Sequence, residues 1–172
     1  MTGGGGPGAM GEGAGAGDTL QVVVFHVGEH EFAFNIFQVQ RVIRYERPAA
    51  VPKAPPFLEG VLQIERAVVP VIDLRKRFEL PHAPLGPDTR IIVVEADGAA
   101  VGAVVDRVSE VLRVAADAVT PPPPVVRGLA AAYIQGIVAL PSRTVVLLHA
   151  GRLLTSSERI TLKGLETEAA HG

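Results

Sequence analysis

Cysteine and tryptophan are both absent from this chain of 172 residues, and aromatic residues make up only 5% of it. Without cysteine the chain has no disulfide, no thiolate ligand for a metal and no thiol nucleophile. The absence also fits a reducing cytoplasm, where disulfides are rare. So few aromatic side chains disfavour a surface on which single-stranded nucleic acid could stack.

Excess charge of either sign is also lacking, because the formal net charge is only -2 at pH 7. No basic field or Lys/Arg run is available to attract phosphates or an anionic membrane surface. No apolar run is long enough to span a bilayer, and residues 1–18 have neither the basic start nor the apolar stretch of a signal peptide. We therefore expect no nucleic-acid partner, no direct membrane insertion and a cytoplasmic location.

Motifs of catalysis are missing as well. There is no Gly-rich phosphate loop followed by Lys and Ser/Thr, and no serine stands in a nucleophile elbow. His26 and His30 flank an expected turn and could meet in a strand pair, but a metal site needs three or four ligands in one place. Asp73 and Asp106 are expected at strand ends, where aspartate commonly caps turns and helices. We expect no enzyme activity, metal or cofactor.

Short runs of β-branched and apolar residues, separated by turn residues, dominate what remains. Asn35 and Asp73 are each expected to cap a short helix, the second extending to Phe78, and another short helix is expected around 150–155. Strands are expected at residues 20–27, 31–34, 42–45, 60–64, 67–72, 90–95, 99–105, 108–114, 135–140 and 144–148. Many short strands with few helices predict an all-β fold of barrels or a sandwich.

The distribution of glycine and proline predicts the domain organisation. Residues 1–18 are expected to be a disordered Gly-rich tail, residues 19–157 a single domain, and residues 158–172 a polar C-terminal tail. The prolines near 81–88 suggest a boundary between two intertwined barrel subdomains. Periodicity does not decide to which barrel the last strands return.

One segment carries a family resemblance. Residues 60–78 read GVLQIERAVVPVIDLRKRF, which closely resembles the signature of CheW proteins and of the CheW-like regulatory domain of chemotaxis kinases. Four further stretches resemble the same family in the same order. They are residues 25–42, 52–60, 101–112 and 133–140, so that the resemblance covers roughly residues 20–157.

The resemblance implies two small five-stranded SH3-like barrels around a shared apolar core, with short helices. It also implies a non-enzymatic scaffold that couples chemoreceptors, the methyl-accepting chemotaxis proteins, to a CheA-type histidine kinase. A groove between the barrels would contact the cytoplasmic tip of the receptor, and other edges would contact the regulatory domain of the kinase. Such a protein would be cytoplasmic and recruited to membrane-associated or soluble receptor arrays.

The chain departs from the family at the turn of the first barrel, where Asn-Leu-Arg-Gly is usual and residues 63–66 read Gln-Ile-Glu-Arg. Glu65 stands where a receptor-contacting Arg is expected, and Arg66 where a Gly is expected, which disfavours a positive φ there. Arg41 stands where the family often carries a Glu. Two charges are therefore inverted on what we expect to be one face. Either the receptor tip carries reversed charges, or this is an accessory adaptor with weakened receptor binding.

The candidate receptor- or kinase-binding residues are Ile36, Val39, Arg41, Glu65 and Arg66. Ile36 and Val39 are equally compatible with a place in the core, since apolar residues are usually buried. Three other functions remain open: a small-molecule-binding β-barrel module, a fragment of a kinase regulatory domain, and an accessory adaptor of a non-motility pathway.

Overall fold

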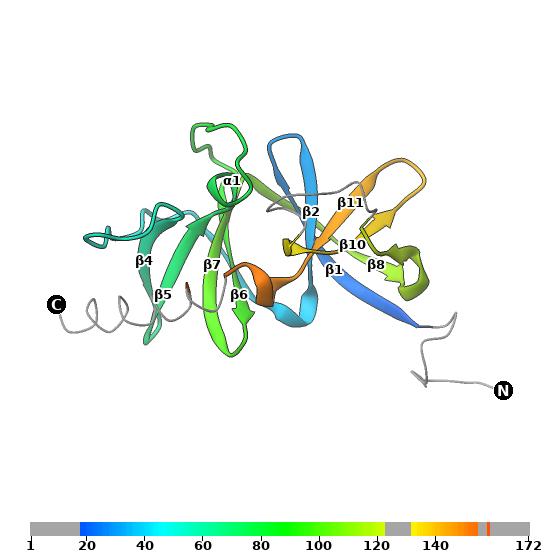
Figure 1. Ribbon diagram of the computed structural model, residues 1–172, viewed down its shortest axis with the longest axis horizontal. Helices are drawn as coiled ribbons and strands as arrows, with labels where there is room; N and C mark the ends of the chain where they lie inside the picture. The colour runs from blue at the N-terminus through cyan, green and yellow to red at the C-terminus, as the bar shows by residue number, and fades with distance from the viewer. Residues whose placement is uncertain (1–17, 123–131, 155–157, 159–172) are drawn as a thin grey trace.

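The computed structural model describes residues 18–122, 132–154 and 158, which form two β-sheets with a few single-turn helices (Figure 1). The all-β fold class is therefore confirmed. Both expected tails, apart from Asp18 and Glu158, lie outside the described residues.

The first sheet closes on itself to form barrel A. Its strand order is β8-β1-β2-β11-β10-β9. Strands β8 and β9 are separated only by the 3₁₀ helix η3 (Ala116–Ala118); β8 pairs with β1 and β9 with β10. This one stretch of chain thus joins both edges of the sheet, so barrel A has five strands when β8 and β9 are counted together. The bounds are β1 (Thr19–Val27), β2 (His30–Asn35), β8 (Arg107–Ala115), β9 (Val119–Thr120), β10 (Ile134–Ala139) and β11 (Thr144–Leu148).

The second sheet, barrel B, has the strand order β3-β6-β7-β5-β4. It is closed by an antiparallel bridge between Ala49, beyond the end of β3, and Val61 in β4. Two backbone hydrogen bonds form this bridge, at 2.8 Å from the Ala49 N–H and 2.9 Å from the Val61 N–H. The bounds are β3 (Val39–Arg44), β4 (Leu58–Ile64), β5 (Ala67–Asp73), β6 (Arg90–Ala96) and β7 (Ala99–Val105).

The two barrels share one pairing pattern. Each contains two antiparallel hairpins joined side by side by one parallel pair, β2 with β11 in barrel A and β5 with β7 in barrel B. The expected arrangement of two five-stranded barrels is thus present.

The division between the barrels does not follow the proline-rich segment 81–88. That segment connects helix α1 (Leu74–Arg77) to β6, and both belong to barrel B. The strands of barrel B all lie within residues 39–105, whereas barrel A takes its strands from both sides of that range. The chain crosses between barrels at the 3₁₀ helix η2 (Ile36–Gln38) and again at Asp106. Prolines here mark a break in regular structure without a change of sheet.

Both expected helix caps are present. The Asn35 side chain accepts a hydrogen bond from the Phe37 N–H at 3.0 Å, and that of Asp73 accepts one from the Arg75 N–H at 2.9 Å. The first cap starts the single turn of η2, after which β3 begins at Val39. The helix expected near residue 150 is the 3₁₀ helix η4 (Ala150–Arg152).

A shared apolar core joins the barrels. Its largest cluster combines Phe25 and Phe34 of barrel A with Ile72 and Ile92 of barrel B, all fully buried. Burial of each such side chain contributes about 1.5–3 kcal/mol to stability. A smaller cluster fills each barrel separately. The shared core that the family resemblance implied is therefore present, and it holds the barrels in contact.

Candidate partner-binding face

The two residues with inverted charges form an ion pair. Arg41 lies on β3 and Glu65 in the β4–β5 turn, and the Arg41 Nη2 is 2.7 Å from the Glu65 Oε2. β3 and β4 stand at opposite ends of the sheet order, but closure of barrel B brings them together. Both side chains are exposed, at 42% and 71%. Such an exposed pair contributes only about 0–1 kcal/mol to stability, so it adds little to the closure of barrel B.

The β4–β5 turn corrects one expectation about backbone strain. The positive φ falls on Glu65, at 56°, whereas Arg66 is not among the residues with positive φ. The substitution of Arg for Gly at position 66 therefore introduces no strain of this kind. Arg66 is exposed at the end of the hairpin, beside the ion pair in sequence.

Ile36 and Val39 lie at the first crossing between the barrels. Helix η2 contacts both β1 of barrel A and β6 of barrel B. Both residues are half-buried, and Val39 packs against the shared core. Part of each side chain is therefore covered at this crossing and part faces solvent, which is compatible with either of their two expected roles.

Phe37 is a feature of this face that the sequence reasoning missed. Its side chain is 90% exposed, the most exposed of the large apolar residues in the described chain. The cap at Asn35 binds the backbone of Phe37 while Ile36 and Val39 turn toward protein, which leaves the ring outside. The signal was available in its position, since an aromatic residue in a single turn falls out of phase with its apolar neighbours. Exposed aromatic residues are enriched at protein interfaces.

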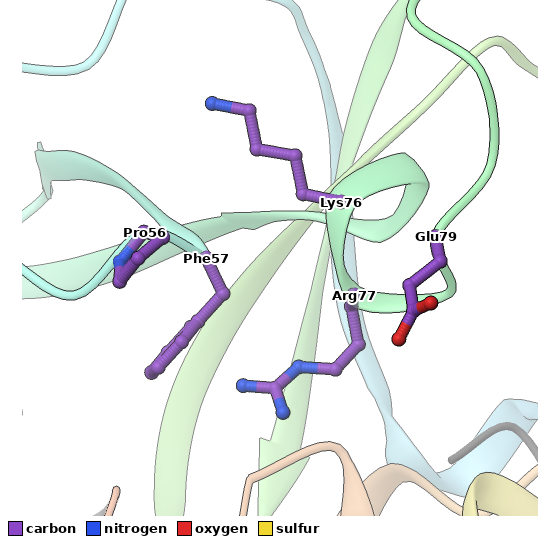
Figure 2. A pocket seen from close by; sticks show the side chains of 5 residues that line it. All are labelled: Pro56, Phe57, Lys76, Arg77 and Glu79. Atoms are coloured by element: carbon purple, nitrogen blue, oxygen red, sulfur yellow. The ribbon is translucent and has the colours of Figure 1, made fainter. Parts of the chain in front are cut away.

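A second polar cluster lies around α1, beside a hollow of about 400 Å³ (Figure 2). Arg77 is only 8% exposed, and its guanidinium lies 4.2 Å from the centre of the Phe57 ring. It donates to the Tyr133 hydroxyl at 2.9 Å and to the Glu158 carboxylate at 3.0 and 3.2 Å. These partners already satisfy most of its donors.

Lys76, the neighbour of Arg77 on the same helix, points elsewhere. Figure 2 shows its side chain leaving α1 on a different side from Arg77. The Lys76 ammonium lies 2.7 Å from the Glu59 carboxylate. This hydrogen-bonded ion pair raises the pKa of Lys76 above its usual value.

Within the described part of the chain, no group of three or more His, Asp or Glu side chains is placed to hold a metal ion. The same residues include no helix that is long and apolar enough to cross a membrane.

Comparison with known proteins identifies the family. The model of the CheW-like domain matches residues 21–158. The chemotaxis protein CheW of Klebsiella aerogenes is 33% identical over 145 residues, covering 83% of this chain and 87% of that protein. The CheW of Bacillus subtilis is 31% identical over 134 residues, covering 78% and 86%. The crystal structure of the scaffolding protein TtCheW from Thermoanaerobacter tengcongensis superposes with a TM-score of 0.76 at 30% identity, covering 82% of this chain and 96% of that one. The chain therefore belongs to the CheW-like domain family.

Proposed function

We propose that this chain is a non-enzymatic adaptor that couples chemoreceptors to a CheA-type histidine kinase. The family match over residues 21–158 carries the proposal, because it spans every strand of both barrels from Gln21 onward. The similarity to a solved scaffolding protein over 96% of its length supports it. Coupling needs only two binding surfaces, which closed barrels can present without a reactive group. The adaptor acts in the cytoplasm, where it is recruited to receptor arrays.

The receptor-binding face comprises η2, the start of β3 and the β4–β5 turn. Phe37 supplies a large exposed apolar side chain, while Arg41 and Glu65 supply opposite charges on the same barrel. Aromatic anchors give binding energy, whereas charges at the edge of an interface steer the choice of partner. The face therefore combines affinity with selectivity.

The inverted ion pair selects the receptor. Because Arg41 and Glu65 pair with each other, the inversion preserves their mutual attraction and reverses the polarity that a partner meets. A receptor tip with the usual arrangement of charges would face repulsion here, and one with reversed charges would not. The chain therefore prefers a receptor whose charged tip residues are reversed.

A co-sedimentation assay tests the coupling function. The purified chain is mixed with the kinase and the receptor fragment encoded nearest to it in the genome, and each is also tested in pairs. We expect the kinase to sediment with the receptor only when the chain is present. Binding to the kinase alone would instead indicate an accessory adaptor, and binding to neither by a folded sample would refute the proposal.

A charge swap tests the receptor preference. Arg41→Glu and Glu65→Arg are made singly and together, and each protein is titrated with a receptor fragment of the usual type. Each single variant places like charges where the ion pair was, whereas the double variant restores an ion pair of the usual polarity. We expect only the double variant to bind the usual receptor about tenfold more tightly than the parent chain, equivalent to about 1.4 kcal/mol. No gain by the double variant would contradict the proposed preference.

A further inference from the structure

Helix α1 belongs to barrel B but directs two arginine side chains to barrel A. It follows β5 directly, and its cap at Asp73 fixes its start. Arg75 and Arg77 are two residues apart in this single turn, and each bonds to a residue outside barrel B. We call these two side chains with their partners the arginine clasp. Figure 1 places α1 near β2, on the side of barrel B that faces barrel A.

Arg75 forms the first half of the clasp, at the second crossing between the barrels. Its Nη2 donates to the Asp106 carboxylate at 2.6 Å, and the same oxygen accepts the Gly28 N–H of the β1–β2 turn at 2.7 Å. The Asp106 N–H also donates to the His26 carbonyl at 2.9 Å. Asp106 is thus bonded to barrel A through both backbone and side chain, and Arg75 connects it to barrel B. The other terminal nitrogen of Arg75 donates to the Pro81 carbonyl at 2.6 Å.

Arg77 forms the second half. Its buried bond to the Tyr133 hydroxyl reaches the residue directly before β10 of barrel A. Lys76 lies between the two arginines, but its ion pair with Glu59 stays within barrel B. The same helical turn therefore contains two cations that bridge the barrels and one that does not.

The clasp adds geometrically specific hydrogen bonds to a contact between the barrels that is otherwise apolar. Apolar burial holds the barrels together but depends little on orientation. Hydrogen bonds between charged groups are short and geometrically demanding, and planar guanidinium groups especially so. The Arg75 side chain is 15% exposed and that of Asp106 39%, so this partly buried ion pair is screened by solvent less than a fully exposed one. Loss of the bond would leave the barrels joined, with more freedom to rotate.

We propose that the arginine clasp fixes the angle between the barrels and so shapes the receptor-binding face, which makes Arg75 and Asp106 positioning residues. This inference rests on the adaptor function proposed above. Helix η2 contacts strands of both barrels, so the surface around it changes when one barrel rotates against the other. A contact made by one barrel alone does not depend on that angle. The clasp therefore affects receptor binding around η2 more than it affects kinase binding at an edge that belongs to one barrel.

The angle is measured directly by spin labelling, which the absence of cysteine makes simple. Glu95→Cys on β6 and Gln135→Cys on β10 place one exposed label on each barrel. Pulsed electron–electron double resonance then gives the distribution of distances between the two labels, one on each barrel. We expect Arg75→Gln to broaden or shift this distribution, and Lys76→Gln, the matched control, to leave it unchanged. Asp106→Asn, which retains an oxygen for the Gly28 N–H, provides a second test if Arg75→Gln folds poorly.

Binding without labels completes the test. We expect Arg75→Gln and Asp106→Asn to lose about fivefold or more in receptor affinity, while kinase affinity stays within about twofold. Lys76→Gln should retain both. An unchanged distance distribution in folded Arg75→Gln and Asp106→Asn would overturn the clasp, as would an equal loss of both partners. If the parent chain binds neither partner, the adaptor function fails while the distance measurement still tests the clasp.

Discussion

Residues 48–49 pass close to Gly60 of β4 where barrel B closes. We therefore expect Gly60→Ala to destabilise the protein strongly. Gly60 adopts φ +148°, a conformation that side chains disfavour. A Cβ added there would collide with the Ala49 carbonyl oxygen and lie 2.9 Å from the Pro48 Cβ. The obstructed segment is the one that bridges to Val61 and closes the barrel.

The magnitude follows from two contributions. An alanine forced into a positive φ costs about 1–2 kcal/mol. Displacement of Ala49 adds the two hydrogen bonds of the bridge, each worth about 0.5–1.5 kcal/mol. The expected loss is therefore about 2–5 kcal/mol, a large part of the roughly 5–15 kcal/mol that stabilises a typical domain.

Urea unfolding at equilibrium measures the loss, and Gly98→Ala provides the matched control. Gly98 also has a positive φ, +84°, but a Cβ there would have no atom within 4 Å. Its substitution should cost only the conformational part, about 1–2 kcal/mol. If Gly60→Ala loses no more stability than Gly98→Ala, the close approach of residues 48–49 to Gly60 adds no cost. The proposed need for glycine at this position would then be refuted.

Two further predictions concern an exposed ring and a histidine. Phe37→Ala should change the free energy of unfolding by no more than about 0.5 kcal/mol, because the ring is exposed, yet weaken receptor binding. Phe34→Ala, which removes a fully buried ring nearby, should cost about 3–5 kcal/mol; equal stability losses would contradict the described burial. Burial, followed by the charge of Arg107, lowers the pKa of His26 below 6.5. As the pH falls below 6.5 the unfolded state takes up this proton first, so stability should fall, and less so in His26→Gln. Identical pH profiles of unfolding for parent and variant would refute this.

Local features of this fold were predictable from residue patterns, whereas the arrangement of two barrels around one core was expected only from the family resemblance. Strand positions follow from β-branched runs, and the caps at Asn35 and Asp73 follow from side chains that bond to backbone two residues away. The assignment of strands to barrels depends on pairing between distant segments. Prolines at 81–88 therefore suggested a boundary that the sheets do not have.

The same distinction applies to the candidate site. Inversion of charge at Arg41 and Glu65 was evident from the family pattern, but their contact depends on closure through the Ala49–Val61 bridge. The positive φ falls on Glu65 and not on Arg66, and residue identity alone did not indicate which of the two turn residues adopts it. Exposure of Phe37 is a local feature that its position in the single turn of η2 could have indicated, whereas the packing of η2 against β1 and β6 depends on both barrels.

In the sequence, the strands of barrel B lie between those of barrel A, and this order has a consequence for synthesis on the ribosome. All five strands of barrel B are available once residue 105 has emerged, whereas the β1–β2 hairpin lacks β8 until residue 115 and β11 until residue 148. At about 5–20 residues per second, the hairpin waits on the order of 6–20 s with open edges. Open strand edges invite pairing with other chains. Barrel B can therefore fold first and present its half of the apolar core. The β1–β2 hairpin can pack against that surface until the last strand of barrel A has been synthesised.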